Sequence, residues 1–552
     1  MARDNTGVES AIDLDAILAQ LGPFGKYNIV NYALLLFPIY LAGMFGSVFV
    51  FEAPDISYRC EIKQCESFNQ SLWLDYTIPR DKGELSKCKR YQWRENLSTI
   101  NNESCSEQNF NVEITEKCDR YVYSDEDSVV KDFDLGCQNW KRTLIGTIHN
   151  SGLFLSLPVT GIISDRYGRK VALSIASLMN GLFGFIRSFS TSYTMMLVLE
   201  FLEAGLGAGA YSTAFVLAME LVGPKGRVFG NTIINAVYVL GLMSLAGLSW
   251  WLQSWRQLLR IIYAPAMLVI SYLWLLNESV RWLLSKGRNN EAANVLKKAM
   301  KMNNVDLSND VLAPLYKLGR AEDFEKVKNE TQNEEIQKEV KKSSTFIQVI
   351  KSRIIRKRVL VCSFLWITCT FVYYGLSINS VSLAGNKYIN FMLVAFVEIP
   401  ANFVCLLVLD RYGRKRTLII TYVLSACLCI SLSLLPKDQK WWSLVLYLSG
   451  KFSITVAYSS VYIYVSEVFP TSMRQSLLAV CSSLGRVGST LAPLTPLLAL
   501  YYDNLPAIFF GSLALMASAM VFTLPETINV ALPDTVEEAE RLSQRQHKKE
   551  SA

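Results

Sequence analysis

The stretch Asp165–Lys170 reads DRYGRK and recurs letter for letter as Asp410–Lys415, 245 residues further along the chain. Two other pairs of motifs repeat at nearly the same offset: Glu220 with Arg227 against Glu467 with Arg474, and Asn277–Ser279 against Pro525–Thr527. Three repeats that share one spacing indicate two homologous halves rather than a chance resemblance between short motifs.

Each half is rich in long apolar segments. The chain has 552 residues, of which 51% are hydrophobic and only 19% are charged. A bilayer core about 30 Å thick needs about 20 apolar residues per helix, so the composition predicts a polytopic membrane protein. It argues against a secreted enzyme, a disordered chain and a nucleic-acid binder. Twelve spans are predicted, at residues 27–51, 142–164, 171–189, 193–219, 228–252, 257–277, 358–378, 386–409, 416–435, 441–466, 475–500 and 506–525.

Lys and Arg residues lie in alternate loops, which sets the orientation of the spans. The DRYGRK motifs, the Lys351–Arg358 segment and the basic tail share one side, which the positive-inside rule makes cytoplasmic. The net charge of +7 reflects this placement of basic residues. An even number of spans puts both termini in the cytoplasm, and residues 1–26 contain no hydrophobic signal-peptide region. The predicted divisions are 1–26 (N-terminus), 27–277 (first six-helix bundle), 278–357 (charged linker helices), 358–525 (second bundle) and 526–552 (tail).

The predicted extracellular loop 52–141 contains six of the twelve cysteines. An even number of cysteines outside the cell predicts disulfide bonds, although the sequence does not choose among the 15 possible connectivities. The cysteines are Cys60, Cys65, Cys88, Cys105, Cys118 and Cys137. The same loop contains three N-glycosylation sequons, at Asn69, Asn96 and Asn102.

The repeated motifs place acidic residues among basic ones at the cytoplasmic ends of the spans. Ion pairs that form in only one part of a conformational cycle suit a gate, whereas basic residues alone would only anchor the chain to the membrane. The acidic members favour gating. The predicted gating residues are Asp165, Arg166, Arg169, Glu220 and Arg227 in the first half, and Asp410, Arg411, Arg414, Glu467 and Arg474 in the second.

These motifs resemble those of a known family. Gly161–Lys170 matches the G-x-x-x-D-R-x-G-R-K signature of the major facilitator superfamily. The Cys-rich loop, Asn277–Leu283 and Glu467–Thr471 resemble solute carrier family 22, the organic cation, anion and zwitterion transporters. Three further segments resemble its carnitine-type branch: Tyr211–Leu217, Gly450–Phe452 and Ser483–Ser489. The resemblance implies an all-α major facilitator fold of twelve transmembrane helices in two pseudo-symmetric bundles, with a disulfide-rich extracellular loop domain. It also implies alternating-access transport of small organic ions, without enzymatic chemistry.

Ionisable residues in the predicted spans are candidates for the binding site, because charges at membrane depth are costly. Glu398, Lys451 and Arg486 are expected near the bilayer midplane in the second half, and Glu200 and Glu203 are expected on one face of the span 193–219 in the first. A cavity between the halves could therefore meet a carboxylate on one wall and an ammonium on the other. Several alternatives stay open: Glu398 pairs internally with Arg486 or Lys451, and His149 packs between helices or relays protons.

Arg486 is the leading candidate to bind a substrate carboxylate, because guanidinium groups bind carboxylates through two hydrogen bonds. The family resemblance supports this role, because anion and carnitine-type members carry Arg at this position. Aromatic and polar side chains are expected to line the rest of the pocket. The proposed substrate-binding residues besides Arg486, Glu398 and Lys451 are Phe154, Tyr211, Asn235, Tyr238, Tyr373, Tyr374, Ser459 and Tyr462.

The sequence contains no nucleotide-binding or metal-binding motif, and its two histidines do not form a catalytic metal centre. We therefore expect no cofactor and no metal, with ion gradients as the energy source and sodium or proton coupling left open. The expected substrates are zwitterions or amino-acid-derived amines such as carnitine, betaine, β-alanine or carcinine. The alternatives are an organic cation or organic anion carrier, or a non-transporting receptor. A multi-pass, monomeric transport unit in the plasma membrane is expected.

Overall fold

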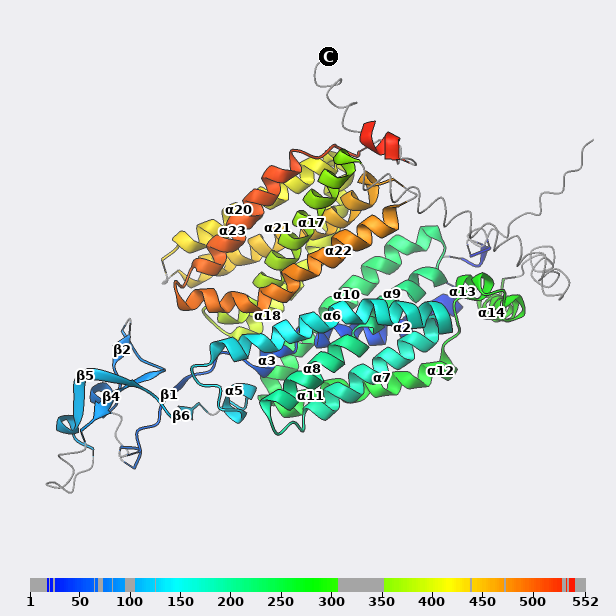
Figure 1. Ribbon diagram of the computed structural model, residues 1–552. Helices are drawn as coiled ribbons and strands as arrows, with labels where there is room; N and C mark the ends of the chain where they lie inside the picture. Colours follow the sequence, from blue (N-terminus) through cyan, green and yellow to red (C-terminus); the bar gives the residue numbers. More distant parts are fainter. Residues whose placement is uncertain are drawn as a thin grey trace, which may run out of the picture.

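The computed structural model describes residues 17–18, 20–22, 25–63, 65–67, 73–81, 83–94, 105–124, 126–305, 352–436, 439–470, 473–528, 533 and 536–541. Two helical bundles lie side by side, and a small β-containing domain extends from one end (Figure 1). Each bundle comes from one half of the chain, as the repeated motifs predict.

The first bundle corresponds to the first six predicted spans. Its helices are α2 (Lys26–Phe45), α3 (Phe49–Glu52), α6 (Asn139–Tyr167), α7 (Arg169–Arg187), α8 (Tyr193–Gly207), α9 (Gly209–Leu221), α10 (Pro224–Leu252), α11 (Trp255–Met267), η4 (Leu268–Ser271) and α12 (Tyr272–Leu275). The predicted span 193–219 corresponds to α8 and α9, which meet at Ala208, between Gly207 and Gly209, with helical backbone angles. A Cβ atom at these glycines would collide with Asn180 of α7 and Thr160 of α6, so glycine allows close helix packing here.

The second bundle corresponds to the last six predicted spans. Its helices are α17 (Arg353–Asn379), η5 (Ser380–Ser382), α18 (Lys387–Phe396), α19 (Glu398–Tyr412), α20 (Arg414–Leu434), α21 (Lys440–Val468), α22 (Arg474–Leu491), η6 (Ala492–Leu500) and α23 (Leu505–Val521). Across the described residues, nine helices or joined helix pairs are long and apolar enough to cross a membrane. The more polar α6 and α7 and the 17-residue α23 occupy the other three predicted spans.

The loop domain is held together by three disulfides. They join Cys60 to Cys118, Cys65 to Cys105 and Cys88 to Cys137, which resolves the connectivity that the sequence left open. The domain also contains α4 (Leu74–Thr77), η3 (Glu107–Asn109), α5 (Val129–Asp132) and six short strands. The strands form three antiparallel pairs: β1 (Tyr58–Cys60) with β6 (Tyr121–Tyr123), β2 (Arg80–Asp81) with β3 (Glu84–Leu85), and β4 (Lys89–Trp93) with β5 (Phe110–Lys117). The sequons at Asn69, Asn96 and Asn102 lie outside the described residues.

The disulfide pairing makes a testable prediction about delivery to the cell surface. Replacing Cys60 by Ser is expected to lower the amount of surface protein, because a native disulfide contributes about 2–5 kcal/mol to a small extracellular domain. Cys118→Ser should cause an equal loss, and the double variant should be no worse than either single one. Surface biotinylation measures this, with uptake per surface molecule as the control. Additive losses in the double variant would contradict the pairing.

The linker after the first bundle begins with two helices that pack against that bundle. They are α13 (Val280–Ser285) and α14 (Asn289–Asn303). The apolar face of α14, including Ala292 and Leu296, is buried in the core of the first half. Asn303 also accepts a hydrogen bond from the Tyr27 backbone N–H at 2.8 Å. This part of the predicted linker therefore belongs structurally to the first half. The Glu- and Lys-rich segment 322–342 lies outside the described residues.

The two bundles contact each other mainly near the loop domain. On that side α10 packs against α18, and α6 packs against η6 and α22. Phe51 contacts both Tyr388 and Phe391 of α18, with ring centroids 5.7 and 5.1 Å apart, and Trp250 stacks on Tyr388. Lys387 also forms an ion pair with Glu126 of the loop domain at 2.6 Å. We call this set of contacts the extracellular closing contact, because it joins the halves on the loop-domain side.

Candidate functional site

Arg486 lies among tyrosines from both halves of the chain. Tyr374, Tyr458 and Tyr238 lie around its guanidinium. Tyr211 of α9 is a further neighbour. Among the residues that the structure describes, no carboxylate lies within ion-pair distance of Arg486. The guanidinium is therefore partly buried in an aromatic environment without an acidic partner, the state in which it can bind a carboxylate from a ligand.

The tyrosines around Arg486 contact one another. Tyr211 and Tyr238 pack edge to face with ring centroids 5.4 Å apart, and these two side chains form the contribution of the first half. Tyr373 of the second half packs against Tyr374 at 5.1 Å and against Tyr458 at 5.2 Å. Aromatic faces of this kind attract organic cations, so the group combines one fixed positive charge with several cation-binding surfaces. Tyr458 was not among the predicted residues, although it lies one position before the predicted Ser459.

Lys451 forms an ion pair with Glu398, which decides one of the alternatives that the sequence left open. The Lys451 ammonium lies 2.9 Å from Glu398 and is fully buried. It also donates to Ser377 Oγ at 2.7 Å and lies 3.2 Å from the Tyr373 ring centroid. Glu398 therefore neutralises Lys451 and not Arg486. This pair supports one wall of the site and contributes no net charge to it.

A cavity lies between the halves next to this pair. It is lined by Ser47, Tyr238, Leu242, Tyr373, Tyr374, Ser377, Phe391, Val394, Ala395 and Glu398. Four of the predicted binding residues, Tyr238, Tyr373, Tyr374 and Glu398, thus line one cavity. The rest of its lining is mainly apolar, and Arg486 and Tyr211 are not part of that lining.

The other predicted pocket residues lie outside this group. Asn235 donates a hydrogen bond to Asn231 of its own helix. Ser459 donates to Asn402 Oδ1 at 2.8 Å, which fixes α21 against α19. Phe154 and Tyr462 are 41% and 53% exposed, and Tyr462 packs edge to face against Trp366. These four residues stay candidates from the sequence alone, because within the described part of the chain none of them forms a side-chain hydrogen bond or ring contact with the tyrosines around Arg486.

Glu200 and Glu203 do not form an acidic wall of the site between the halves, contrary to expectation. Both carboxylates are buried inside the first bundle, where Glu200 pairs with Arg187 and His149. Arg187 also pairs with Glu52 at 2.7 Å and is fully buried. The sequence reasoning missed Arg187, although a charged residue inside the predicted span 171–189 was the available signal. Glu200 and Glu203 therefore pair inside the first bundle, whereas the described neighbours of Arg486 are tyrosines.

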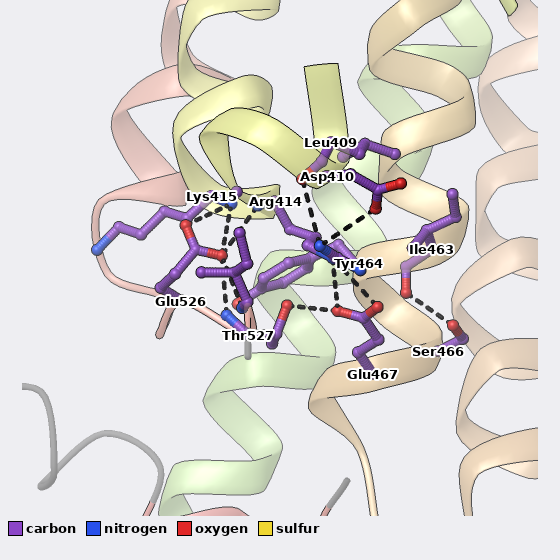
Figure 2. Close-up of polar contacts among 12 residues, drawn as sticks. Leu409, Asp410, Arg414, Lys415, Ile463, Tyr464, Ser466, Glu467, Glu526 and Thr527 are labelled. Atoms are coloured by element: carbon purple, nitrogen blue, oxygen red, sulfur yellow. Dashed lines mark hydrogen bonds and ion pairs between the residues drawn. The ribbon is translucent and has the colours of Figure 1, made fainter. Parts of the chain in front are cut away.

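The motif residues of the second half form a network around the turn between α19 and α20 (Figure 2). The Arg414 side chain contacts Glu467 at 3.1 Å, whereas its contact with Asp410 is 3.9 Å long. Thr527 donates to Glu467 at 2.6 Å. Glu526 accepts hydrogen bonds from the backbone N–H groups of Arg414 and Lys415 and so caps the first turn of α20.

The first half repeats this arrangement. Arg169 contacts Asp165 at 3.0 Å and Glu220 at 3.6 Å, and Glu278 accepts from the backbone N–H groups of Arg169 and Lys170. Burial raises the pKa of the Glu278 carboxyl, while the backbone donors act in the opposite direction. Gly168 and Gly413 have φ of +108° and +89°, and a Cβ at either position would collide with the capping glutamate. Glycine is thus required at both turns.

Each network lies within one half in this conformation. Arg166 and Arg411 lie over the rings of Tyr167 and Tyr412, and Arg474 has two buried nitrogens that find no hydrogen-bond partner among the described residues. Arg227 makes contacts of its own within the described structure. A gating role for these residues remains a proposal, in which the same groups exchange partners when the ends of the bundles approach.

The geometry predicts different consequences for the two acids that contact Arg414. Glu467 is 18% exposed and holds Arg414 closely, whereas Asp410 is 85% exposed. We expect Glu467→Gln to lower maximal uptake per surface molecule by about tenfold, because charge-assisted hydrogen bonds contribute about 1.5–3 kcal/mol. Asp410→Asn should have a smaller effect, since exposed pairs contribute little. Initial uptake rates normalised to surface protein measure both, and equal losses would contradict this ranking.

Comparison with known proteins places this architecture in a family. Residues 90–539 match the family described as sugar (and other) transporter. The chain is 30% identical to the organic cation/carnitine transporter 2 of Homo sapiens, over 97% of this chain and 96% of that protein. It is also 30% identical to solute carrier family 22 member 1 of Bos taurus, over 98% of this chain and 95% of that protein. The chain belongs to solute carrier family 22, within the sugar (and other) transporter family.

Other comparisons agree. The organic cation transporter protein of Drosophila melanogaster is 30% identical over 98% of the chain and 96% of its own length. Among solved structures, the partially occluded inward-open xylose transporter XylE from E. coli superposes with a TM-score of 0.57 at 14% identity, covering 92% of this chain and 100% of that one. This solute carrier family 22 member thus has the major facilitator fold and is a membrane transporter, not an enzyme.

Proposed function

We propose that this family member transports small zwitterions by alternating access, with Arg486 binding the substrate carboxylate. The observation that carries the proposal is a guanidinium inside the protein that has no acidic partner among the described residues and lies among tyrosines of both halves. An uncompensated buried charge is costly unless a ligand of opposite charge completes the site. A carboxylate meets this need with two parallel hydrogen bonds.

The substrate's ammonium group meets aromatic faces. Tyr211, Tyr238, Tyr373, Tyr374 and Tyr458 offer several rings within the reach of a molecule a few atoms long. Cation–π contacts recognise alkylated ammonium groups well, since these need no hydrogen-bond acceptor. This arrangement favours carnitine- and betaine-like compounds, with β-alanine as a less alkylated candidate. Carcinine, which has no carboxylate, fits only the alternative of an organic cation carrier. The name organic cation/carnitine transporter 2 supports the same substrate class, whereas the name organic cation transporter protein fits the alternative of a cation carrier.

The transporter has a defined orientation in the membrane and works as a single chain. The Cys-rich domain faces the outside of the plasma membrane, and both termini and the DRYGRK turns face the cytoplasm, in agreement with the positive-inside rule. One chain forms the transport unit, because each half contributes tyrosines to the same site. The predicted partners are therefore the substrate and the lipid bilayer, with no nucleic acid.

A competition screen tests the substrate class. Cells that express the chain would be given labelled betaine, and unlabelled compounds of matched size would compete: a zwitterion, its ester without the carboxylate, and its analogue without the ammonium. We expect the zwitterion to compete at least tenfold better than either analogue. Equal competition by the ester would indicate an organic cation carrier, and equal competition by the anion an organic anion carrier. Surface binding without uptake would indicate a receptor.

A further inference from the structure

A second group of buried charges lies inside the first bundle, apart from the substrate site. It is built from five helices and consists of Glu52 (α3), His149 (α6), Arg187 (α7), Glu200 and Glu203 (α8) and Tyr263 (α11). The side chains of the four charged residues around His149 are at most 1% exposed, and that of His149 is 3% exposed. We call this group the buried charge cluster.

The cluster contains more acids than bases. Glu52, Glu200 and Glu203 would contribute three negative charges, whereas Arg187 contributes one positive charge and His149 at most one. A net charge is costly at membrane depth. With His149 charged, the cluster is therefore one proton or one cation short of neutrality.

Glu203 has the fewest hydrogen bonds of the three acids in the described structure. Its Oε2 lies 3.5 Å from His149 Nδ1 and 3.7 Å from Arg187 Nη1, and neither of its oxygens has a hydrogen-bond partner in the described structure. Glu200 is bonded to both His149 and Arg187, and Glu52 is bonded to Arg187 through one oxygen. An unsatisfied buried carboxylate is stabilised when it takes up a proton, because the neutral acid has a much smaller desolvation cost.

The cluster is connected to the extracellular closing contact through α3. Phe51, next to Glu52, packs on Tyr388 and Phe391 of the second half. Phe49 of the same short helix packs on His149 with ring centroids 5.5 Å apart, and Gly146 lies against both Phe49 and Pro493 of the second half. Separation of the two halves on this side would therefore shift α3. This shift would move Glu52 and the Phe49 ring that packs on His149.

We propose that the buried charge cluster is a proton-coupling site, in which Glu203 takes up one proton when the extracellular side is open and keeps it when that side closes. The mechanism needs no redox partner: a proton from water binds a Glu203 oxygen and is later released to water. Closing the extracellular side buries the excess charge, which favours the protonated acid, so the proton and the substrate enter together. This inference rests on the proposed transport function, in which the substrate is co-transported with the proton.

Purified protein in liposomes tests the proposal. With the membrane potential clamped and sodium absent, an outside pH one unit below the inside pH should drive about tenfold accumulation of labelled betaine if one proton accompanies each molecule. Betaine exchange at equal pH measures transport without a driving force. We expect Glu203→Gln to keep exchange within about twofold of the unaltered protein and to lose pH-driven accumulation. Glu291→Gln, on the exposed face of α14, is the matched control and should keep both.

The outcomes separate this inference from the proposed function. Accumulation driven by a sodium gradient and not by pH, or unchanged pH-driven accumulation in Glu203→Gln, would overturn the proton site. Absence of betaine exchange would overturn the substrate class, and infrared spectroscopy then tests the proton site alone. The carbonyl band of a protonated carboxylic acid should disappear between pH 5 and pH 9 in the unaltered protein and be missing from Glu203→Gln. The same band in both proteins would refute the inference.

Discussion

Replacing Arg486 by Lys should lower betaine transport by about 10- to 150-fold while the protein still reaches the cell surface. Lysine keeps the positive charge but loses the planar pair of donors, and a charge-assisted bond in a partly desolvated site contributes about 1.5–3 kcal/mol. Arg486→Asp should abolish betaine uptake, because it places an acid where the substrate carboxylate binds. The tyrosine faces would remain, so this variant should favour simple organic cations over zwitterions.

The measurement compares uptake of betaine and of its ester, which lacks the carboxylate, across Arg486→Lys and Arg486→Asp. Only betaine should lose transport if Arg486 binds the carboxylate. Glu398→Gln combined with Arg486→Ala serves as the control for internal pairing, and it should not restore transport, because Glu398 pairs with Lys451 at 2.9 Å. Equal losses for betaine and its ester in both variants would remove Arg486 from the binding site.

Replacing Arg187 by Met should prevent most of the protein from folding. The guanidinium contacts Glu52, Glu200 and Glu203 and donates to the Tyr263 hydroxyl, so its removal leaves three buried carboxylates with only His149 as a base. Removing one member of a buried ion pair lowers the free energy of unfolding by about 3–5 kcal/mol. This is a large part of the stability of a typical protein. Surface protein should fall at least tenfold.

Arg356→Met is the matched control for this prediction, because Arg356 is exposed at the start of α17. Surface biotinylation and thermal unfolding in detergent should show little change for this control. A partial rescue is expected when Arg187→Met is combined with Glu200→Gln, since the double variant removes a charge of each sign. Normal folding of Arg187→Met alone would show that the cluster contributes little to stability.

Much of the architecture could be predicted from the sequence, because it depends on local and repeated patterns. The apolar runs placed the helices, and the repeated DRYGRK motifs identified the two halves. The close helix packing at Gly207 and Gly209 was not predicted. It depends on how closely Asn180 and Thr160 of neighbouring helices approach, which is a property of the tertiary fold.

The site was predicted only in part. Arg486, Tyr211, Tyr238, Tyr373 and Tyr374 do come together in the structure. Whether a buried acid faces a ligand or an internal base could not be read from its depth in a helix. Glu200 and Glu203 were expected at the cavity, yet both lie against Arg187, the last residue of α7.

The sequence by itself determined that this protein is a two-half membrane protein with a disulfide-bonded extracellular domain, because hydropathy, repeat spacing and cysteine placement are properties of the chain alone. Its motifs indicated transport through their resemblance to a known family. Only the tertiary structure decided which cysteines pair, that Glu398 neutralises Lys451, and that Arg187 forms ion pairs with three glutamates. The physical reason is that the free energy of a charge depends on its partners within a few ångströms, and helices distant in sequence supply those partners.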